Sequence, residues 1–228
     1  MTSLKSLVQE TGAILLDFDG PVCRLFSAVP APEIAEKIRS LLRERSVNVP
    51  ESMKTAGDPL VLLRWTGKAV PRLLPEVERL QVESEIRAAR LARPTHGAAE
   101  LIRSSAAQGR PVVIVTNNST EAVETYLDRL SLTVYVSGIS ARIPGRPDLM
   151  KPDPHLVLKG AEIAGKPTSS CVLIGDSPTD IHAAQKAGTR SIGYAKTDTR
   201  VSELSEAGAD VVLRSMSPVA DVMTRLER

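Results

Sequence analysis

Aromatic residues are scarce in this chain, which has two Phe, one Trp and three Tyr among 228 residues. Proteins that bind single-stranded nucleic acid use aromatic side chains to stack on bases, together with a basic groove. An excess of positive charge is also missing, because 29 Lys and Arg residues are offset by 27 Asp and Glu residues, giving a net charge of +2. We therefore expect no nucleic acid partner.

Cysteine is rare, and long apolar runs are missing. Cys23 and Cys171 are too few for a disulfide framework, which favours a reducing, cytoplasmic setting. No uncharged apolar segment approaches the roughly 18 residues that a membrane-spanning helix needs, and the first residues do not follow the pattern of a signal peptide. We expect no membrane association. The sequence carries no signature of a particular oligomeric state.

Short β-rich runs alternate with helical patterns along most of the chain. The runs are nearly continuously apolar, as is typical of parallel strands covered on both faces. We predict strands at 13–16, 111–115, 133–136, 171–174, 191–194 and 210–213. Helices are predicted at 97–108, 120–130 and 154–164. This β-α-β pattern predicts an α/β fold with a doubly wound parallel sheet.

Residues 24–92 interrupt the alternation, because they carry helical patterns and no convincing strand. Their apolar residues recur at helical spacing, and Asp58 followed by Pro59 is a typical helix start. We interpret this segment as a helical unit inserted after the first strand. The predicted organisation is a core made of residues 1–23 and 93–228, with residues 24–92 as an α-helical cap.

Two carboxylates follow the first predicted strand. The strand at 13–16 leads directly into Asp17 and Asp19, and then into Gly20, which allows a sharp turn. Ligands of open α/β sheets bind outside the carboxyl ends of the strands. Two acids there can divide the work of a displacement, since one attacks as a nucleophile and the other transfers a proton. A strand that simply ends in an acidic turn is the alternative interpretation.

A second group of polar residues follows the strand predicted at 111–115. Thr116 and Asn117 offer a hydroxyl and an amide, which could donate hydrogen bonds to a phosphate oxygen. Ordinary capping of the next helix by Asn118 or Ser119 would also explain polar residues at this place.

Two more segments carry charged residues near strand ends. Lys151 stands before a proline-rich turn, where it could neutralise an anion or simply be solvated. Asp176 and Asp180 follow the strand at 171–174. A capping box with Ser177 would explain Asp180, but it leaves Asp176 unexplained.

In this order, the segments DFDG, VTNN, KPDP and GDSPTD resemble the four motifs of the haloacid dehalogenase (HAD) superfamily, in its phosphatase branch. The resemblance covers 1–23 and 93–228, and the helical insertion is similar to the C1 cap of phosphoglycolate phosphatase-like members. It implies a Rossmann-like core with an inserted cap. One departure is Pro21, which replaces the Thr or Val usual after the first motif and removes a backbone N–H.

The resemblance implies a Mg²⁺-dependent phosphomonoester hydrolase that acts on a small phosphorylated metabolite, a phosphosugar or a phosphoacid. Asp17 would be the nucleophile that forms an aspartyl-phosphate, and Asp19 the general acid and base. Thr116, the backbone near Asn117, and Lys151 would hold the transferring phosphoryl group.

The resemblance also implies the metal site. Mg²⁺ would be bound by Asp17, the main-chain carbonyl of Asp19, and Asp176. Asp180 would act through water or by orienting Lys151, with helix capping as the competing interpretation.

In the cap, Arg64 beside Trp65 is a candidate for substrate contact, with packing of a helix face as the alternative. A phosphomutase and a catalytically idle binding protein on the same scaffold are the alternative functions. A dehalogenase is disfavoured, because that branch lacks the second carboxylate.

Overall fold

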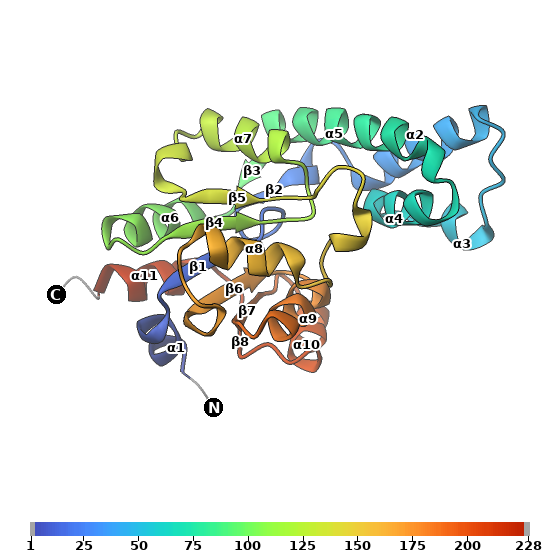
Figure 1. Cartoon of the computed structure of the whole chain (residues 1–228). Helices are drawn as coiled ribbons and strands as arrows, with labels where there is room; N and C mark the ends of the chain where they lie inside the picture. Colours follow the sequence, from blue (N-terminus) through green and yellow to red (C-terminus); the bar gives the residue numbers. More distant parts are fainter. Residues whose placement is uncertain (1–2, 226–228) are drawn as a thin grey trace.

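The computed structural model describes the backbone of residues 3–225 and the side chains of residues 3–222 (Figure 1). Its centre is a parallel sheet with the strand order β5-β4-β1-β6-β7-β8. The strands are β1 (Ala13–Leu16), β4 (Val112–Val115), β5 (Gly138–Ser140), β6 (Cys171–Gly175), β7 (Arg190–Tyr194) and β8 (Val211–Leu213).

The order of the strands reverses at β1. After β1 the chain adds β4 and then β5 on one side, and it returns to the other side of β1 as β6. Leu16 is accordingly paired with Ile114 on one side and with Ile174 on the other. Such a reversal opens a crevice at the carboxyl ends of the strands that flank it, here β1, β4 and β6.

Helices cover both faces of the sheet, which confirms the predicted doubly wound fold. Ile14 and Leu16 belong to a buried core that includes α6, α7 and α11, whereas Leu15 belongs to a separate core that includes α8 and α9. This division follows from the alternation of side chains along a strand. The core helices are α1 (Leu4–Glu10), α6 (Ala98–Ala107), α7 (Thr120–Arg129), α8 (His155–Ile163), α9 (Pro178–Ala187), α10 (Asp198–Glu206) and α11 (Ser217–Arg225).

The segment between β2 (Cys23–Arg24) and β3 (Arg93–Pro94) is helical, as expected. It holds α2 (Ala31–Glu44), α3 (Glu51–Lys54), α4 (Pro59–Ala69) and α5 (Leu74–Leu91), with short 3₁₀ turns at Leu25–Ser27 and Pro71–Leu73. Asp58 begins α4 as predicted, because its carboxylate accepts a hydrogen bond from the Leu60 N–H at 2.8 Å. We keep the term cap for residues 24–92, as the proposed second domain.

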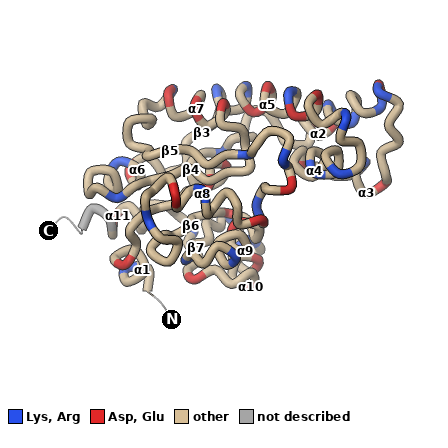
Figure 2. Tube along the Cα trace, in the orientation of Figure 1, with Lys and Arg blue, Asp and Glu red and all other residues tan. Residues whose placement is uncertain are grey.

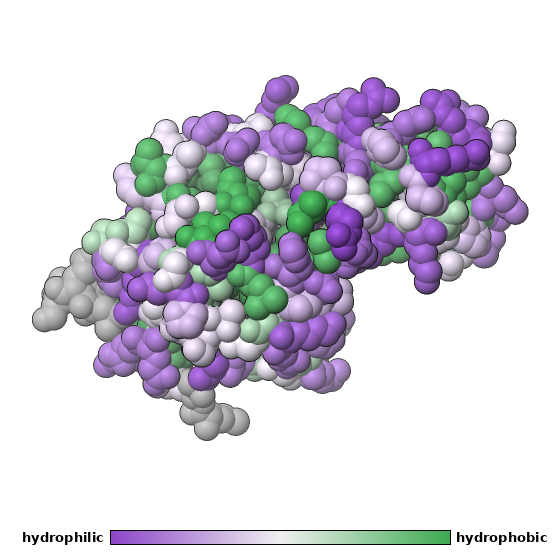
Figure 3. All heavy atoms as spheres, viewed as in Figure 1, coloured by the Kyte–Doolittle hydropathy of each residue, from purple (hydrophilic) through white to green (hydrophobic). Residues whose placement is uncertain are grey.

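The chain enters and leaves this segment through a short antiparallel ribbon. β2 (Cys23–Arg24) pairs with β3 (Arg93–Pro94), and the last cap helix, α5, packs against α7 of the core (Figure 1). Lys, Arg, Asp and Glu positions recur along both of these helices (Figure 2). The molecular face in Figure 3 is mostly hydrophilic, with apolar side chains showing in small groups.

One strand prediction is wrong. Residues Thr133–Tyr135 form a 3₁₀ turn, and the edge strand is β5, two residues beyond the predicted segment. The β-branched run attracted the prediction, yet Val134 is 85% exposed and pairs with no strand among the described residues. Gly138 fits the edge position because a Cβ there would lie 2.6 Å from a methyl group of Ile163 on α8.

The remaining strand predictions agree with the structure to within one residue at each end. Cys23 and Cys171 are both buried free thiols. Among the described helices, none combines the length and the apolar character needed to cross a bilayer.

Candidate active site

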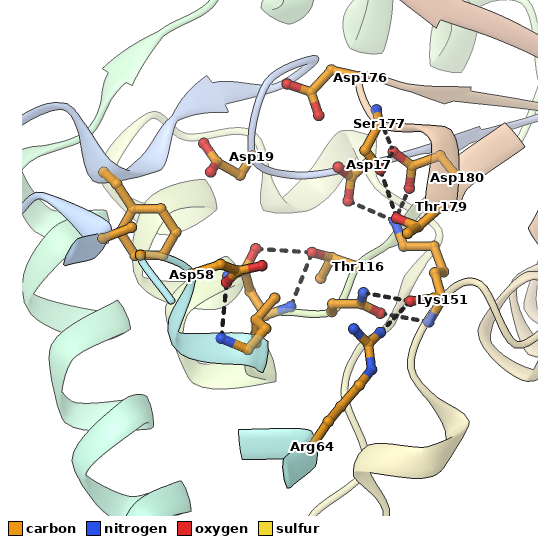
Figure 4. A pocket seen from close by; sticks show the side chains of 16 residues that line it. Asp17, Asp19, Asp58, Arg64, Thr116, Lys151, Asp176, Ser177, Thr179 and Asp180 are labelled. Carbon is orange, nitrogen blue, oxygen red and sulfur yellow. Dashed lines mark hydrogen bonds and ion pairs between the residues drawn. The ribbon is translucent and has the colours of Figure 1, made fainter. Parts of the chain in front are cut away.

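A cavity of about 430 Å³ lies at the carboxyl ends of β1, β4 and β6, between the sheet and the cap (Figure 4). The core contributes Asp17, Asp19, Thr116, Asn117, Asn118, Lys151, Asp176, Ser177, Thr179 and Asp180, and the cap contributes Phe26, Ala31, Gly57, Asp58, Leu60 and Arg64. Every site residue predicted from the sequence lies in this wall. The strand order explains why these residues meet, because β1 lies between β4 and β6 in the sheet.

Lys151 is buried against two carboxylates. Its Nζ lies 2.8 Å from Asp17 Oδ1 and 2.6 Å from Asp180 Oδ1, and it donates to the Val115 carbonyl at 2.9 Å. These acceptors use all three protons of the ammonium group. Burial favours a lower pKa for Lys151, but the charges of Asp17 and Asp180 outweigh it and raise the pKa. Lys151 is therefore a permanent buried cation, and its interpretation as a solvated side chain is wrong.

The backbone of Lys151 is held from two directions. Asn117 Oδ1 accepts from the Lys151 N–H at 2.8 Å, and Asn117 Nδ2 donates to the Lys151 carbonyl at 3.1 Å. The guanidinium of Arg64 donates to the same carbonyl from the cap (Figure 4). The amide of Asn117 is thus used to position Lys151, while its main-chain N–H donates to no acceptor among the described residues.

Asp180 combines the two roles that the sequence left open. Its Oδ2 accepts from the Ser177 N–H at 3.0 Å and from the Ser177 hydroxyl at 2.8 Å, which forms the capping box of α9. Its Oδ1 is the atom that pairs with Lys151. One carboxylate therefore begins the helix and orients the cation.

Asp19 and Asp176 lie on the opposite side of Asp17, with their carboxylates directed into the same space (Figure 4). Asp19 Oδ1 accepts a hydrogen bond from the Leu25 N–H at 2.8 Å. Gly20 has φ +110°, and a Cβ there would lie 2.3 Å from Asp176 Oδ2. Glycine at position 20 is required both for this backbone conformation and for the close approach of Asp176.

Three of the carboxylates resist ionisation. Burial raises the pKa of Asp17 to about 7, against the pull of Lys151. Burial also raises the pKa of Asp176 to about 8, and the charges of Asp17, Asp180 and Asp19 add to this effect. The pKa of Asp19 is raised by burial to about 6, although the Leu25 N–H opposes the shift. The site therefore has more buried negative charge than Lys151 balances.

This excess of negative charge fits a divalent cation. Oxygen atoms of Asp17, Asp176 and Asp180 lie within 4.8 Å of one another. Carboxylate oxygens are the ligands that Mg²⁺ and Ca²⁺ prefer, and a cation at this place would stabilise the ionised forms of the three acids.

The hydroxyl of Thr116 is buried at the end of β4. It donates to Asn118 Oδ1 at 3.0 Å and accepts from the Asn118 N–H at 3.1 Å. Ser119 is the N-cap of α7, so the capping interpretation holds for Ser119 but does not account for Thr116.

The cap residues that line the cavity, here called the cap wall, are the part of the site that the sequence predicted least well. Arg64 reaches the cavity, whereas its neighbour Trp65 packs against the hydrophobic core. Phe26 and Leu60 were not predicted to line the site, and no sequence signal distinguishes them from core residues. Asp58 carried a signal, but only as a helix cap.

Comparisons with known proteins agree with this geometry. Residues 11–188 match the haloacid dehalogenase-like hydrolase family. The phosphoglycolate phosphatase of Thiobacillus denitrificans is 24% identical over 97% of this chain and 100% of its own length. The chloroplastic protein SUPPRESSOR OF QUENCHING 1 of Arabidopsis thaliana is 31% identical over 56% of this chain, a match that spans 12% of that protein. A HAD-like protein of unknown function from Agrobacterium tumefaciens superposes with a TM-score of 0.63 at 24% identity, covering 96% of this chain and 100% of its own.

The parallel sheet, with acidic residues where its strand order reverses, is typical of an α/β enzyme that binds its ligand at the carboxyl ends of the strands. Because the family match covers residues 11–188, the chain belongs to the haloacid dehalogenase-like hydrolases, and it is similar to phosphoglycolate phosphatases.

Proposed function

We propose that the protein hydrolyses phosphomonoesters of small metabolites. The observation that carries this proposal is the cluster at the end of β1, where Asp17 lies between the buried cation Lys151 and two further carboxylates, Asp19 and Asp176. Similarity to phosphatases over the full chain length supports the same reaction.

Asp17 is the proposed nucleophile. One of its oxygens attacks phosphorus, the bond from phosphorus to the ester oxygen breaks, and an aspartyl-phosphate forms. Asp19 donates its proton to the departing alkoxide, for which its raised pKa of about 6 is suitable. Asp19 then takes a proton from the water that attacks phosphorus, which releases phosphate and regenerates Asp17.

The proposed metal is Mg²⁺. Asp17, Asp176 and the main-chain carbonyl of Asp19 would hold it, with Asp180 beside them on Lys151. When bound, Mg²⁺ would reduce the repulsion between the anionic nucleophile and the phosphoryl oxygens.

Hydrogen-bond donors surround the place where the phosphoryl group would lie. Thr116 and Lys151 line this place, and a phosphoryl oxygen there would take over the protons that the Thr116 hydroxyl donates to Asn118 and that the Lys151 ammonium group donates to Asp17. The main-chain N–H groups of Phe18, Asp19 and Asn117 donate to no acceptor within residues 3–225, so they are free to bind an anion. We propose that these groups stabilise the charge of the transferring phosphoryl group.

The cap wall favours a small, acidic substrate. Arg64 and Asp58 are the charged residues of this wall, and the Arg64 guanidinium lies at the Lys151 carbonyl, beside the proposed catalytic residues. A second anionic group on a phosphoacid would find a bidentate partner there. Two buried free thiols, Cys23 and Cys171, support the proposed cytoplasmic setting.

The purified protein should be assayed against a panel of phosphorylated acids and sugars in Mg²⁺, with released phosphate measured directly. We expect phosphate release, lost in chelator and restored by Mg²⁺. Isomerised phosphate ester without release would show a phosphomutase instead. No turnover of any phosphomonoester would favour a catalytically idle binding protein.

A further inference from the structure

We propose that Glu85, on cap helix α5, is a positioning residue that holds the phosphoryl-binding loop 116–119 in its working conformation. The inference rests on the proposed function, since it concerns the loop that would bind the transferring group. It assigns a role in the reaction to a residue that no sequence motif contains.

Glu85 is fully buried and is paired with a core arginine. Its Oε1 lies 2.9 Å from Arg142 Nη1, and its Oε2 accepts from Arg142 Nη2 at 3.0 Å. Arg142 follows β5, and its side chain is 3% exposed. Burial favours a higher pKa for Glu85, but the charge and hydrogen bonds of Arg142 outweigh it and lower the pKa. Glu85 is therefore an ionised carboxylate inside the protein.

Both carboxylate oxygens of Glu85 also accept hydrogen bonds from the loop. Oε2 accepts from the Ser119 N–H at 2.9 Å, and Oε1 accepts from Asn118 Nδ2 at 3.2 Å. Arg142 Nη1 also donates to the Asn117 carbonyl at 2.7 Å. The ion pair thus binds three consecutive residues of the loop.

The orientation of the Asn118 side-chain amide links the Glu85 carboxylate to the Thr116 hydroxyl. An ionised carboxylate only accepts hydrogen bonds, so it draws the NH₂ end of the Asn118 amide toward itself. The oxygen end then faces Thr116 and accepts from its hydroxyl at 3.0 Å. Glu85 therefore determines, through Asn118, where the Thr116 hydroxyl is held.

The side-chain amide of Gln81 also turns its hydrogen-bond donor toward the Glu85 carboxylate. Gln81 lies one helical turn earlier on α5, and its Nε2 donates to Glu85 Oε1 at 3.0 Å. Its own Oε1 is buried and has no hydrogen-bond partner among the described residues. The amide faces the carboxylate even though its oxygen is left unpaired.

Packing alone does not require this arrangement. Apolar side chains of similar volume often replace a buried ion pair without loss of stability. Here, however, they would leave the Ser119 N–H and the Asn118 amide without their acceptor. The ion pair consequently couples the cap helix to the loop in a way that an apolar contact cannot.

The first test compares Glu85→Gln with Glu78→Gln. Glu78 is the control, since it lies on the same helix and accepts the Gly145 N–H of the core at 2.9 Å, and no hydrogen bond joins its carboxylate to loop 116–119 among the described residues. We expect Glu85→Gln to lower kcat/KM about 10–100-fold, chiefly through KM, and to weaken inhibition by inorganic phosphate in parallel. Glu78→Gln should leave both unchanged. Equal kinetics for the two variants would overturn the proposal.

Glu85→Gln leaves Arg142 buried without its charge partner, so this variant could fail to fold. The double variant Glu85→Met with Arg142→Met removes both charges and keeps the volume. We expect it to fold, to lose protection of the Ser119 amide against hydrogen exchange, and to bind phosphate as weakly as Glu85→Gln. A folded double variant with wild-type kinetics would show that the pair serves packing alone.

Asn118→Leu provides a further measurement if the double variant is unstable. It leaves the ion pair intact but removes the link to Thr116, so phosphate affinity should fall while Ser119 stays protected from exchange. Unchanged phosphate affinity would contradict the relay. An inactive wild-type protein would overturn the proposed function, whereas exchange at Ser119 would still test whether Glu85 holds the loop.

Discussion

Buried carboxylates occur in two regions of this protein, and their pKa values move in opposite directions. In the proposed catalytic cluster, Asp17 and Asp176 have pKa values raised to about 7 and about 8. In the cap contact, burial of Glu85 is outweighed by Arg142, and its pKa falls. Burial is common to both, so the difference lies in the number of cations and hydrogen-bond donors.

The two arrangements show how buried charge can be used differently. Glu85 has an arginine and three further donors, so its charge is balanced and its position is fixed. The catalytic cluster shares one ammonium group, that of Lys151, among several carboxylates. Its remaining negative charge is available to a metal ion and to proton transfer.

The largest effect is expected from Asp17→Asn. Turnover should fall at least about 10³-fold, because the amide is not a nucleophile. The melting temperature of the metal-free protein should stay equal or rise, since the variant removes a poorly solvated charge and leaves Lys151 paired with Asp180. Glu85→Gln is the same acid-to-amide change and should lower the melting temperature. A similar fall in melting temperature for Asp17→Asn and Glu85→Gln would contradict the difference in charge balance between the two regions.

Asp19→Asn should reduce the hydrolysis of alkyl phosphates by about 10²–10⁴-fold, because proton transfer to the leaving group is lost. An aryl phosphate with a good leaving group needs less protonation, so its first step should be less affected. Steady-state rates together with the initial burst of released phenol would separate the two steps. Unimpaired hydrolysis of alkyl phosphates would remove Asp19 from the role of general acid.

The excess charge of the cluster predicts how the stability of the metal-free protein depends on pH. Asp17, Asp19 and Asp176 have folded pKa values of about 7, 6 and 8, above the ordinary value of 3.8. The folded state therefore binds more protons than the unfolded chain between about pH 4 and 8. The free energy of unfolding should fall as pH rises through this window.

Mg²⁺ should restore the stability that the metal-free protein loses as pH rises. It should raise the melting temperature by several degrees at pH 8 and little at pH 5. The stabilisation should disappear in Asp176→Ala, measured by thermal unfolding with and without chelator. Equal responses of Asp176→Ala and the wild type to Mg²⁺ would exclude Asp176 from the metal site.

The smallest effect is expected at the cap wall. Arg64→Ala should lower kcat/KM about 10-fold more for a carboxylated phosphomonoester than for an uncharged one, because a charge-assisted hydrogen bond is lost. The guanidinium also donates to the Lys151 carbonyl, which would affect both substrates alike. Equal proportional changes would mean that Arg64 supports Lys151 and does not contact the substrate.

The sequence predicted most of the sheet and the acidic and polar side chains that line the cavity at its carboxyl edge. Apolar runs marked the strands because both faces of a parallel sheet are buried, and polar motifs followed directly where those runs ended. It failed at 133–136, where a β-branched run forms an exposed turn and a run containing glycine forms the edge strand. Local propensity was outweighed there by the close packing of Gly138 against Ile163.

Other features depend on residues far apart in the chain. Asp180 serves as helix cap and as partner of Lys151, and only the fold shows that one carboxylate reaches both. Arg64 lies 87 residues from Lys151 in the chain, yet it donates to the Lys151 carbonyl.

By itself, the sequence determined the kind of fold and the chemical groups at the strand ends, because both follow from short-range patterns of apolar and polar residues. The tertiary structure alone decided which carboxylates are balanced by cations. Glu85 meets Arg142 across 57 residues and Asn118 across 33. A glutamate on a helix rich in charged residues carries no sign of burial, because its partners are brought to it only by the packing of α5 against the core.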